Sequence, residues 1–184
     1  MRITVIGCGR WGSFITWYLD SIGHQVFLYG RKTSAHMQRF LKERKNNLLT
    51  LPESVGLSTD LSIAAGAEVI VISVNSQGLQ KLMDELKALN LREKKIVLCM
   101  KGIEIETGRR LSQIAEENLD KSNVVAVWLG PGHVQEFTRG IPNCMVIDSK
   151  NKDIVKELVF EFSGPLIRFY YGTCLLYTSD AADE

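Results

Sequence analysis

Residues 2–32, RITVIGCGRWGSFITWYLDSIGHQVFLYGRK, decide the fold of this chain. Arg2–Ile6 is apolar and β-branched, as expected of a buried parallel strand, and it runs directly into the turn 7–12, GCGRWG. Apolar residues then recur at helical spacing up to Gly23, and Gln25–Tyr29 reads as a second strand. A G-x-G-x-x-G box in this strand–turn–helix–strand context predicts a dinucleotide-binding unit.

Each glycine of the box has a separate role in that prediction. Gly7 permits the tight turn, Gly9 lets the backbone approach a pyrophosphate, and Gly12 lets the helix pack closely on the strand. The helix start offers free N–H groups and a positive dipole end to the phosphates. The alternative is a tight turn between strand and helix in an unrelated α/β protein.

The end of the second strand bears on the choice of cofactor. An acid there would bind the adenosine ribose hydroxyls and repel a 2′-phosphate, but residues 30–33 are Gly30, Arg31, Lys32 and Thr33. A guanidinium clamps a phosphate with two parallel hydrogen bonds and stacks on adenine. We therefore expect NADP(H) to be preferred, with NAD(H) also accepted. The alternative is that Arg31 and Lys32 only begin a solvated basic helix.

The bulk properties are those of one cytoplasmic α/β enzyme domain. The chain has 184 residues, 45% hydrophobic and 23% charged, with a net charge of +1. This balance gives no reason to expect a nucleic-acid partner or insertion into a membrane, and the first strand starts without a signal-peptide pattern. The four cysteines lack metal-ligand or redox-motif spacing, and we expect Cys99 and Cys144 to be buried thiols in strands.

Strands and helices keep alternating along the rest of the chain. We expect further strands at 68–74, 95–100, 124–129 and 144–147. Helices are expected at 33–45, 61–65, 77–89 with Ser76 as its cap, 109–119 and 155–162, with a loop at 46–58. Repeated strand–helix units predict a Rossmann-type, doubly wound, mostly parallel sheet with helices on both faces.

Ligands of such sheets bind outside the carboxyl ends of the strands. Residues 73–77, Lys101-Gly102 and 130–133 follow strands and are candidates. Lys101 could reach a phosphate or a carbonyl oxygen, or it could be a surface lysine at a strand end. His133 could take part in chemistry or pack on backbone in its loop, and Trp11 could cover the pyrophosphate or fill the core.

Several ordered blocks resemble a known family. The box Gly7-Cys8-Gly9-Arg10-Trp11-Gly12 is similar to the G-x-G-x-W-G of bacterial NAD(P)-dependent sn-glycerol-3-phosphate dehydrogenases. The blocks 51–55 (LPESV), 57–61 (LSTDL), 101–104 (KGIE), 107–109 (TGR), 130–133 (GPGH) and 139–142 (RGIP) also resemble that family, over residues 1–173.

The resemblance implies reversible hydride transfer between dihydroxyacetone phosphate and sn-glycerol 3-phosphate, a phospholipid precursor. Carried over by position, it implies cofactor contacts at Arg10, Trp11, Arg31, Lys32, Lys101 and Val134, and substrate contacts at Lys101, Gly130 and Gly132. The partner is then a small phosphorylated triose, and the full-length protein could be a homodimer. Two positions depart from the family: Gly132 replaces a usual serine, and Asn75 replaces a common proline.

The resemblance also places the catalytic base elsewhere. In the family a second, all-helical domain brings the lysine that accepts the hydroxyl proton, so residues 1–173 are expected to be an NAD(P)-binding domain without a catalytic residue. Residues 174–184, CLLYTSDAADE, resemble a translated sequencing-library adapter, the alternative being a genuine tail with a short helix from Ser179.

Three other functions remain open from the sequence. One is the N-terminal domain of a related hydroxyacid or ketopantoate-type dehydrogenase, which would share the glycine box. The second is a non-catalytic NADP-binding module that senses redox state. The third is an interaction domain with a vestigial nucleotide fold.

Overall fold

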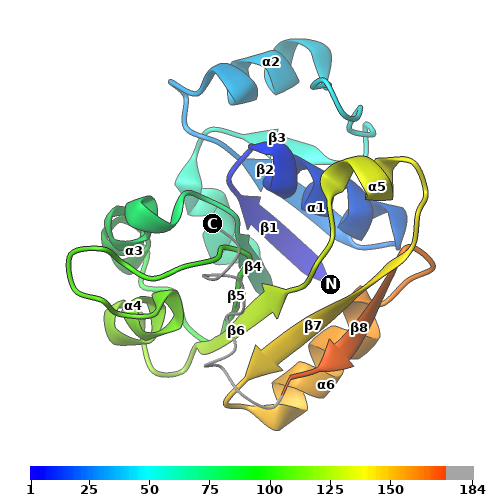
Figure 1. The fold of residues 1–184 in the computed structure, drawn as a ribbon. Coiled ribbons are helices and arrows are strands. Elements are labelled where there is room, and N and C mark those ends of the chain that lie inside the picture. The colour runs from blue at the N-terminus through cyan, green and yellow to red at the C-terminus, as the bar shows by residue number, and fades with distance from the viewer. Residues whose placement is uncertain (173–184) are drawn as a thin grey trace.

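The structure, a computed structural model, describes residues 1–172 and contains one eight-stranded sheet (Figure 1). The strands lie in the order β3-β2-β1-β4-β5-β6-β7-β8, so the direction of winding reverses between β1 and β4. Their bounds are β1 Arg2–Ile6, β2 Gln25–Tyr29, β3 Gly56–Ser58, β4 Val69–Ile72, β5 Lys95–Leu98, β6 Val124–Leu129, β7 Asn143–Ser149 and β8 Ile167–Tyr171. This order confirms the predicted Rossmann-type fold.

Helices cover both faces of the sheet (Figure 1). The helices are α1 Arg10–Ser21, α2 Ala35–Glu43, α3 Leu79–Lys87, α4 Leu111–Asn118, α5 Val134–Thr138 and α6 Lys152–Phe162, with 3-10 turns η1 Leu61–Gly66 and η2 Ser76–Gly78. Alternate residues of the central strands face two separate cores: Val71 belongs to the core that includes residues of α1 and α6, whereas Ile72 belongs to the core that includes residues of α3 and α4. Burial on both faces explains the continuous apolar runs of β1 and β4.

The C-terminal part of the sheet differs from the prediction. Strand β7 runs antiparallel to β6, because α5, between them, has only five residues and makes no full crossover. Strand β8 and helix α5 were not predicted, and neither was strand β3 at the opposite edge of the sheet, where a loop was expected.

Two local expectations were also wrong. Asn75, not Ser76, caps the turn before α3: its side chain accepts a hydrogen bond from the Gln77 backbone N–H at 2.9 Å. Cys144 is exposed, because it lies on the outward-facing side of β7, and Cys99 is half-buried and lies just after the end of β5. Cys174 and the expected adapter-derived tail lie outside the described residues.

Tyr18 joins the N-terminal unit to the C-terminal strands. Its buried hydroxyl donates a hydrogen bond to the Phe162 carbonyl oxygen at 2.6 Å, 144 residues away in sequence. Burial raises the pKa of this hydroxyl, so it is a permanent donor at physiological pH. This bond ties α1 to the end of α6.

Replacing Tyr18 with phenylalanine should therefore destabilise the fold. Tyr18→Phe leaves the Phe162 carbonyl without this donor, and we expect the free energy of unfolding in urea to fall by about 1–3 kcal/mol. Tyr171→Phe is the matched control, because Tyr171 is 60% exposed, and should change it by less than about 0.5 kcal/mol. Equal losses in the two variants would contradict the role of this bond.

Candidate functional site

The glycine turn between β1 and α1 is packed so tightly that two of its glycines have no room for a side chain. Gly7 has a φ of +115°, and a Cβ there would lie 2.1 Å from the Ser73 carbonyl oxygen. A Cβ on Gly12 would lie 1.7 Å from the Gly7 carbonyl oxygen. These glycines bring α1 against the ends of β1 and β4.

Gly9 has the opposite surroundings. Among residues 1–172, nothing lies within 4 Å of a Cβ built on Gly9, although Gly9 is the N-cap of α1. In the part of the chain that the structure describes, no side chain caps this helix start and its first turn carries no acid, so its N–H groups and positive dipole end can bind an anion. The residues present therefore fit a pyrophosphate at this turn.

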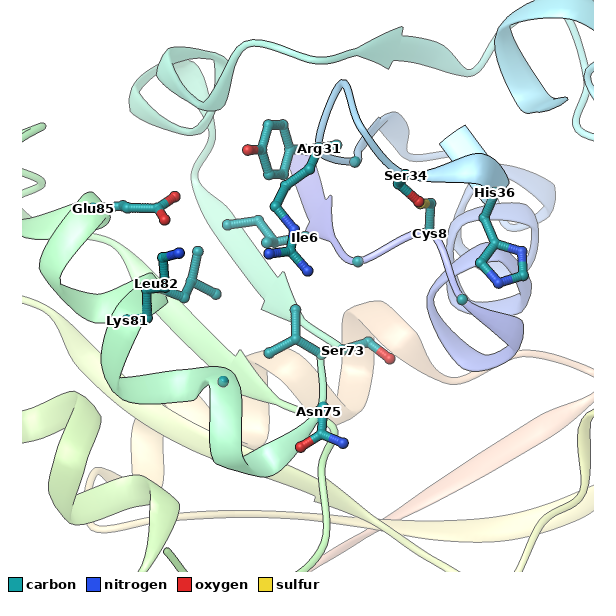
Figure 2. A pocket seen from close by; sticks show the side chains of 16 residues that line it. Ile6, Cys8, Arg31, Ser34, His36, Ser73, Asn75, Lys81, Leu82 and Glu85 are labelled. Atoms are coloured by element: carbon teal, nitrogen blue, oxygen red, sulfur yellow. The ribbon is translucent and has the colours of Figure 1, made fainter. Parts of the chain in front are cut away.

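A first cavity of about 390 Å³ opens beside the turn at the carboxyl ends of β1, β2 and β4 (Figure 2). One wall comes from the β2–α2 connection and the first turn of α2 and carries Arg31, Ser34 and His36, while α3 supplies Lys81, Leu82 and Glu85. Burial raises the pKa of Tyr29 at the cavity floor, the nearby Glu85 carboxylate raises it further, and Arg31 opposes this. The cavity is thus lined by apolar residues such as Ile6 and Leu82 together with the charged Arg31, Lys81 and Glu85.

A second cavity, of about 600 Å³, lies on the other side of the turn. It is lined by residues of the turn and of the loops after β4, β5 and β6: Gly9, Arg10, Trp11, Ile15, Ser73, Val74, Ser76, Cys99, Met100, Lys101, Trp128, Leu129, Gly130, Gly132, His133 and Met145. Gly9, Ser73 and Val74 line both cavities. The two cavities therefore meet over the glycine turn, where an extended ligand could occupy both.

The structure brings most of the predicted site residues to these cavities. Gly7, Gly9 and Arg31 line the first, and Gly9, Arg10, Trp11, Lys101, Gly130 and Gly132 line the second. Three others do not line either cavity. Gly12 is buried in the turn, Val134 is 3% exposed in the core, and Lys32 is exposed with its carbonyl accepting from Gln38.

The packing of Phe137 explains why position 132 is a glycine. A Cβ on Gly132 would lie 2.2 Å from the Phe137 ring, which also packs on Trp11 at 6.2 Å and stacks on Phe14 at 5.0 Å. The aromatic cluster thus occupies the space that a serine side chain would need. Trp11 both lines the second cavity and packs in the core, so its two predicted roles are compatible.

Sequence reasoning missed four polar residues of the first cavity: Ser34, His36, Lys81 and Glu85. Lys81 and Glu85 are one helical turn apart and share a face, but only the tertiary structure shows that this face borders the cavity. No group of three or more His, Cys, Asp or Glu side chains within residues 1–172 could hold a metal ion. None of the helices in this range is long and apolar enough to cross a lipid bilayer.

The fold and the paired cavities define a Rossmann-type dinucleotide-binding domain. The family model for the NAD-dependent glycerol-3-phosphate dehydrogenase N-terminus matches residues 2–155, and the chain belongs to that family. It is 32% identical over 174 residues to glycerol-3-phosphate dehydrogenase [NAD(P)+] of Thermoanaerobacter sp. (strain X514), covering 92% of this chain and 52% of that protein. Against the enzyme of the same name from Prosthecochloris aestuarii it is 33% identical over 180 residues, covering 94% and 54%.

Solved structures show the same fold. The glycerol-3-phosphate dehydrogenase of Coxiella burnetii superposes with a TM-score of 0.86 at 24% identity, over 95% of this chain and 55% of that one. A ketopantoate reductase family structure from Ralstonia eutropha superposes with a TM-score of 0.70 at 17% identity, over 95% and 57%. The fold alone therefore does not choose between these enzymes, and the family match does. The chain spans about half the length of the curated relatives it matches.

Substitutions at two glycines separate ligand binding from folding. Gly9→Ala should leave the free energy of unfolding within about 0.5 kcal/mol of the parent, because its Cβ enters open space, but should weaken dinucleotide binding about tenfold. Gly12→Ala should lose about 3 kcal/mol or more, because its Cβ overlaps backbone. Urea denaturation and a dinucleotide titration measure both effects, and unimpaired binding by Gly9→Ala would contradict this site.

The cysteines should differ in reactivity. Burial raises the pKa of the Cys99 thiol, so it stays protonated at neutral pH, whereas Cys144 is exposed on β7. At pH 8, iodoacetamide should alkylate Cys144 well before Cys99, as read by mass spectrometry of peptides. Rapid alkylation of Cys99 in the folded chain would contradict the raised pKa of its thiol.

Proposed function

We propose that this chain is the cofactor-binding half of an NAD(P)-dependent glycerol-3-phosphate dehydrogenase. The reaction is reversible hydride transfer between dihydroxyacetone phosphate and sn-glycerol 3-phosphate, a phospholipid precursor, in the cytoplasm. The observation that carries the proposal is the pair of cavities that meet over Gly9 in a chain matched by this family.

In this proposal, each cavity binds a different part of the cofactor. The N–H groups at the start of α1 bind the pyrophosphate, and the first cavity takes the adenosine half. The second cavity then holds the nicotinamide and the substrate. When bound, the cofactor supplies or accepts the hydride.

Lys101 lines the second cavity, and we assign its ammonium group to contact with the substrate. It is exposed on the loop after β5 and faces a space also lined by Gly130 and Gly132. A fixed ammonium there would attract the triose phosphate and stabilise negative charge on the reacting oxygen. Gly130 has a φ of +154°, and a Cβ on it would lie 2.8 Å from the Met145 side chain, so the loop presents backbone to the substrate.

We further propose that this domain prefers NADP(H) over NAD(H). A Cβ on Gly30 would lie 2.6 Å from the Cys8 sulfur and 2.8 Å from the Met37 Cβ, so an acidic side chain has no room at position 30. Arg31 follows and lines the cavity. The loss of a ribose-binding acid and the gain of a guanidinium both favour a 2′-phosphate.

We place the proton-accepting lysine outside residues 1–173, as the family resemblance implies. General acid–base catalysis contributes about 10²–10⁴-fold. The 184-residue chain is therefore expected to bind cofactor and to turn over substrate barely.

Titration of the chain with NADPH and with NADH tests the proposal. Trp11 and Trp128 line the second cavity, so intrinsic tryptophan fluorescence should report binding, with NADPH tighter. Arg31→Gln should weaken NADPH about tenfold and leave NADH within about twofold.

The matched control is Arg92→Gln, which removes an exposed arginine from the loop before β5, away from both cavities. It should leave both affinities unchanged. Equal affinities for the two dinucleotides in the parent would overturn the NADP preference, and binding of neither would overturn the function.

A further inference from the structure

The charges around the first cavity are distributed unevenly. Glu85 is the one carboxylate among the lining residues that the structure describes, and it lies on α3 with Lys81 one turn away. The opposite wall carries Ser34 and His36 without an acid. Figure 2 shows Lys81 and Glu85 on one side, Cys8, Ser34 and His36 on the other, and Arg31 between them. The α2 side therefore offers hydrogen-bond donors to an anion with no carboxylate beside them.

The α2 wall is held in place by the glycine turn. The Ser34 hydroxyl lies 3.4 Å from the Cys8 sulfur and caps α2 by accepting from the Met37 backbone N–H. His36 is in the first turn of that helix, and its imidazole is exposed at the cavity. Because the cap fixes the helix start, His36 has a defined position relative to Gly9 and Arg31.

Lys32 is less well placed than His36, although it is adjacent to Arg31. It is not among the residues that line the cavity, and its carbonyl accepts a 2.7 Å hydrogen bond from the Gln38 side chain, which fixes the backbone there. His36, four residues further on, reaches the cavity from the helix instead. Arg31 and His36 thus line the same cavity, one from the loop after β2 and the other from the first turn of α2.

We propose that His36 is a ligand of the 2′-phosphate of NADP(H), opposite Arg31, and that it contributes to discrimination between NADP(H) and NAD(H). The inference rests on the proposed function and identifies a residue of the same site. An imidazole always carries at least one N–H donor and gains positive charge when protonated, so it can bind a phosphate in either state. Gly30, directly before Arg31 in the chain, leaves no room for a side chain, so no acid at that position competes for the 2′-phosphate.

The test measures affinities of the 184-residue chain for two matched pairs of ligands. The first pair is NADPH and NADH; the second is adenosine 2′,5′-bisphosphate and 5′-AMP, which differ only in the 2′-phosphate. His36→Ala should weaken NADPH and the bisphosphate by about three- to tenfold and leave NADH and 5′-AMP within about twofold. His36→Lys should restore most of the loss, because it returns a cationic donor to the same position.

Two further variants test whether the effect belongs to His36 or to the positive charge of the whole segment. Lys42→Ala removes a cation from the same helix away from the cavity, and it should leave all four affinities unchanged. Lys32→Ala should weaken the binding of NADPH and the bisphosphate less than His36→Ala does. Thermal unfolding of each variant confirms that α2 is intact.

Three results would overturn the proposal. If Lys32→Ala lost as much NADPH affinity as His36→Ala or more, the residue that binds the 2′-phosphate together with Arg31 would be Lys32. An equal loss for NADPH and NADH in His36→Ala would show a structural role instead. Failure of the parent chain to bind either dinucleotide would overturn the proposed function itself, and this outcome is distinct because it appears before any substitution.

Discussion

Helix α1 approaches the end of β1 at a distance that only glycine permits, since a Cβ on Gly12 would lie 1.7 Å from the Gly7 carbonyl oxygen. This contact puts the first turn of α1 at the carboxyl edge of the sheet. It also places the turn between β1 and β4, where the order of strands reverses. Free N–H groups, an open space over Gly9 and a crevice on each side then coincide. The remaining features of the site depend on this arrangement.

Burial on both faces keeps the arrangement rigid. Residues such as Val71 and Ile72 alternate between two cores, so β4 cannot shift without exposing apolar surface on one side. The loops after these strands carry the polar groups, because they are free of the packing constraints of the strands. Lys101 and Arg31 are therefore presented at the edge by a rigid scaffold.

The sequence predicts the central strands and the glycine turn well, but it predicts the edge of the sheet at β7 and the helix faces at the first cavity poorly. The glycine box, the apolar strands and the rule that ligands lie at carboxyl ends are local or topological signals, and they were enough to bring Lys101 and Gly130 to one cavity. The direction of β7 depends on how far the short α5 carries the chain, which no local pattern encodes. Lys81, Glu85 and His36 were missed because a polar helix face borders a cavity only after the helices have packed.

The central claim is that one dinucleotide spans both cavities across Gly9. A crystal structure of the chain with NADPH tests it most directly. We expect the pyrophosphate on the backbone N–H groups of Arg10 and Trp11, with the adenosine 2′-phosphate beside Arg31. A cofactor bound away from Gly9, with no contact to the glycine turn, would contradict the claim and leave the turn with a purely structural role.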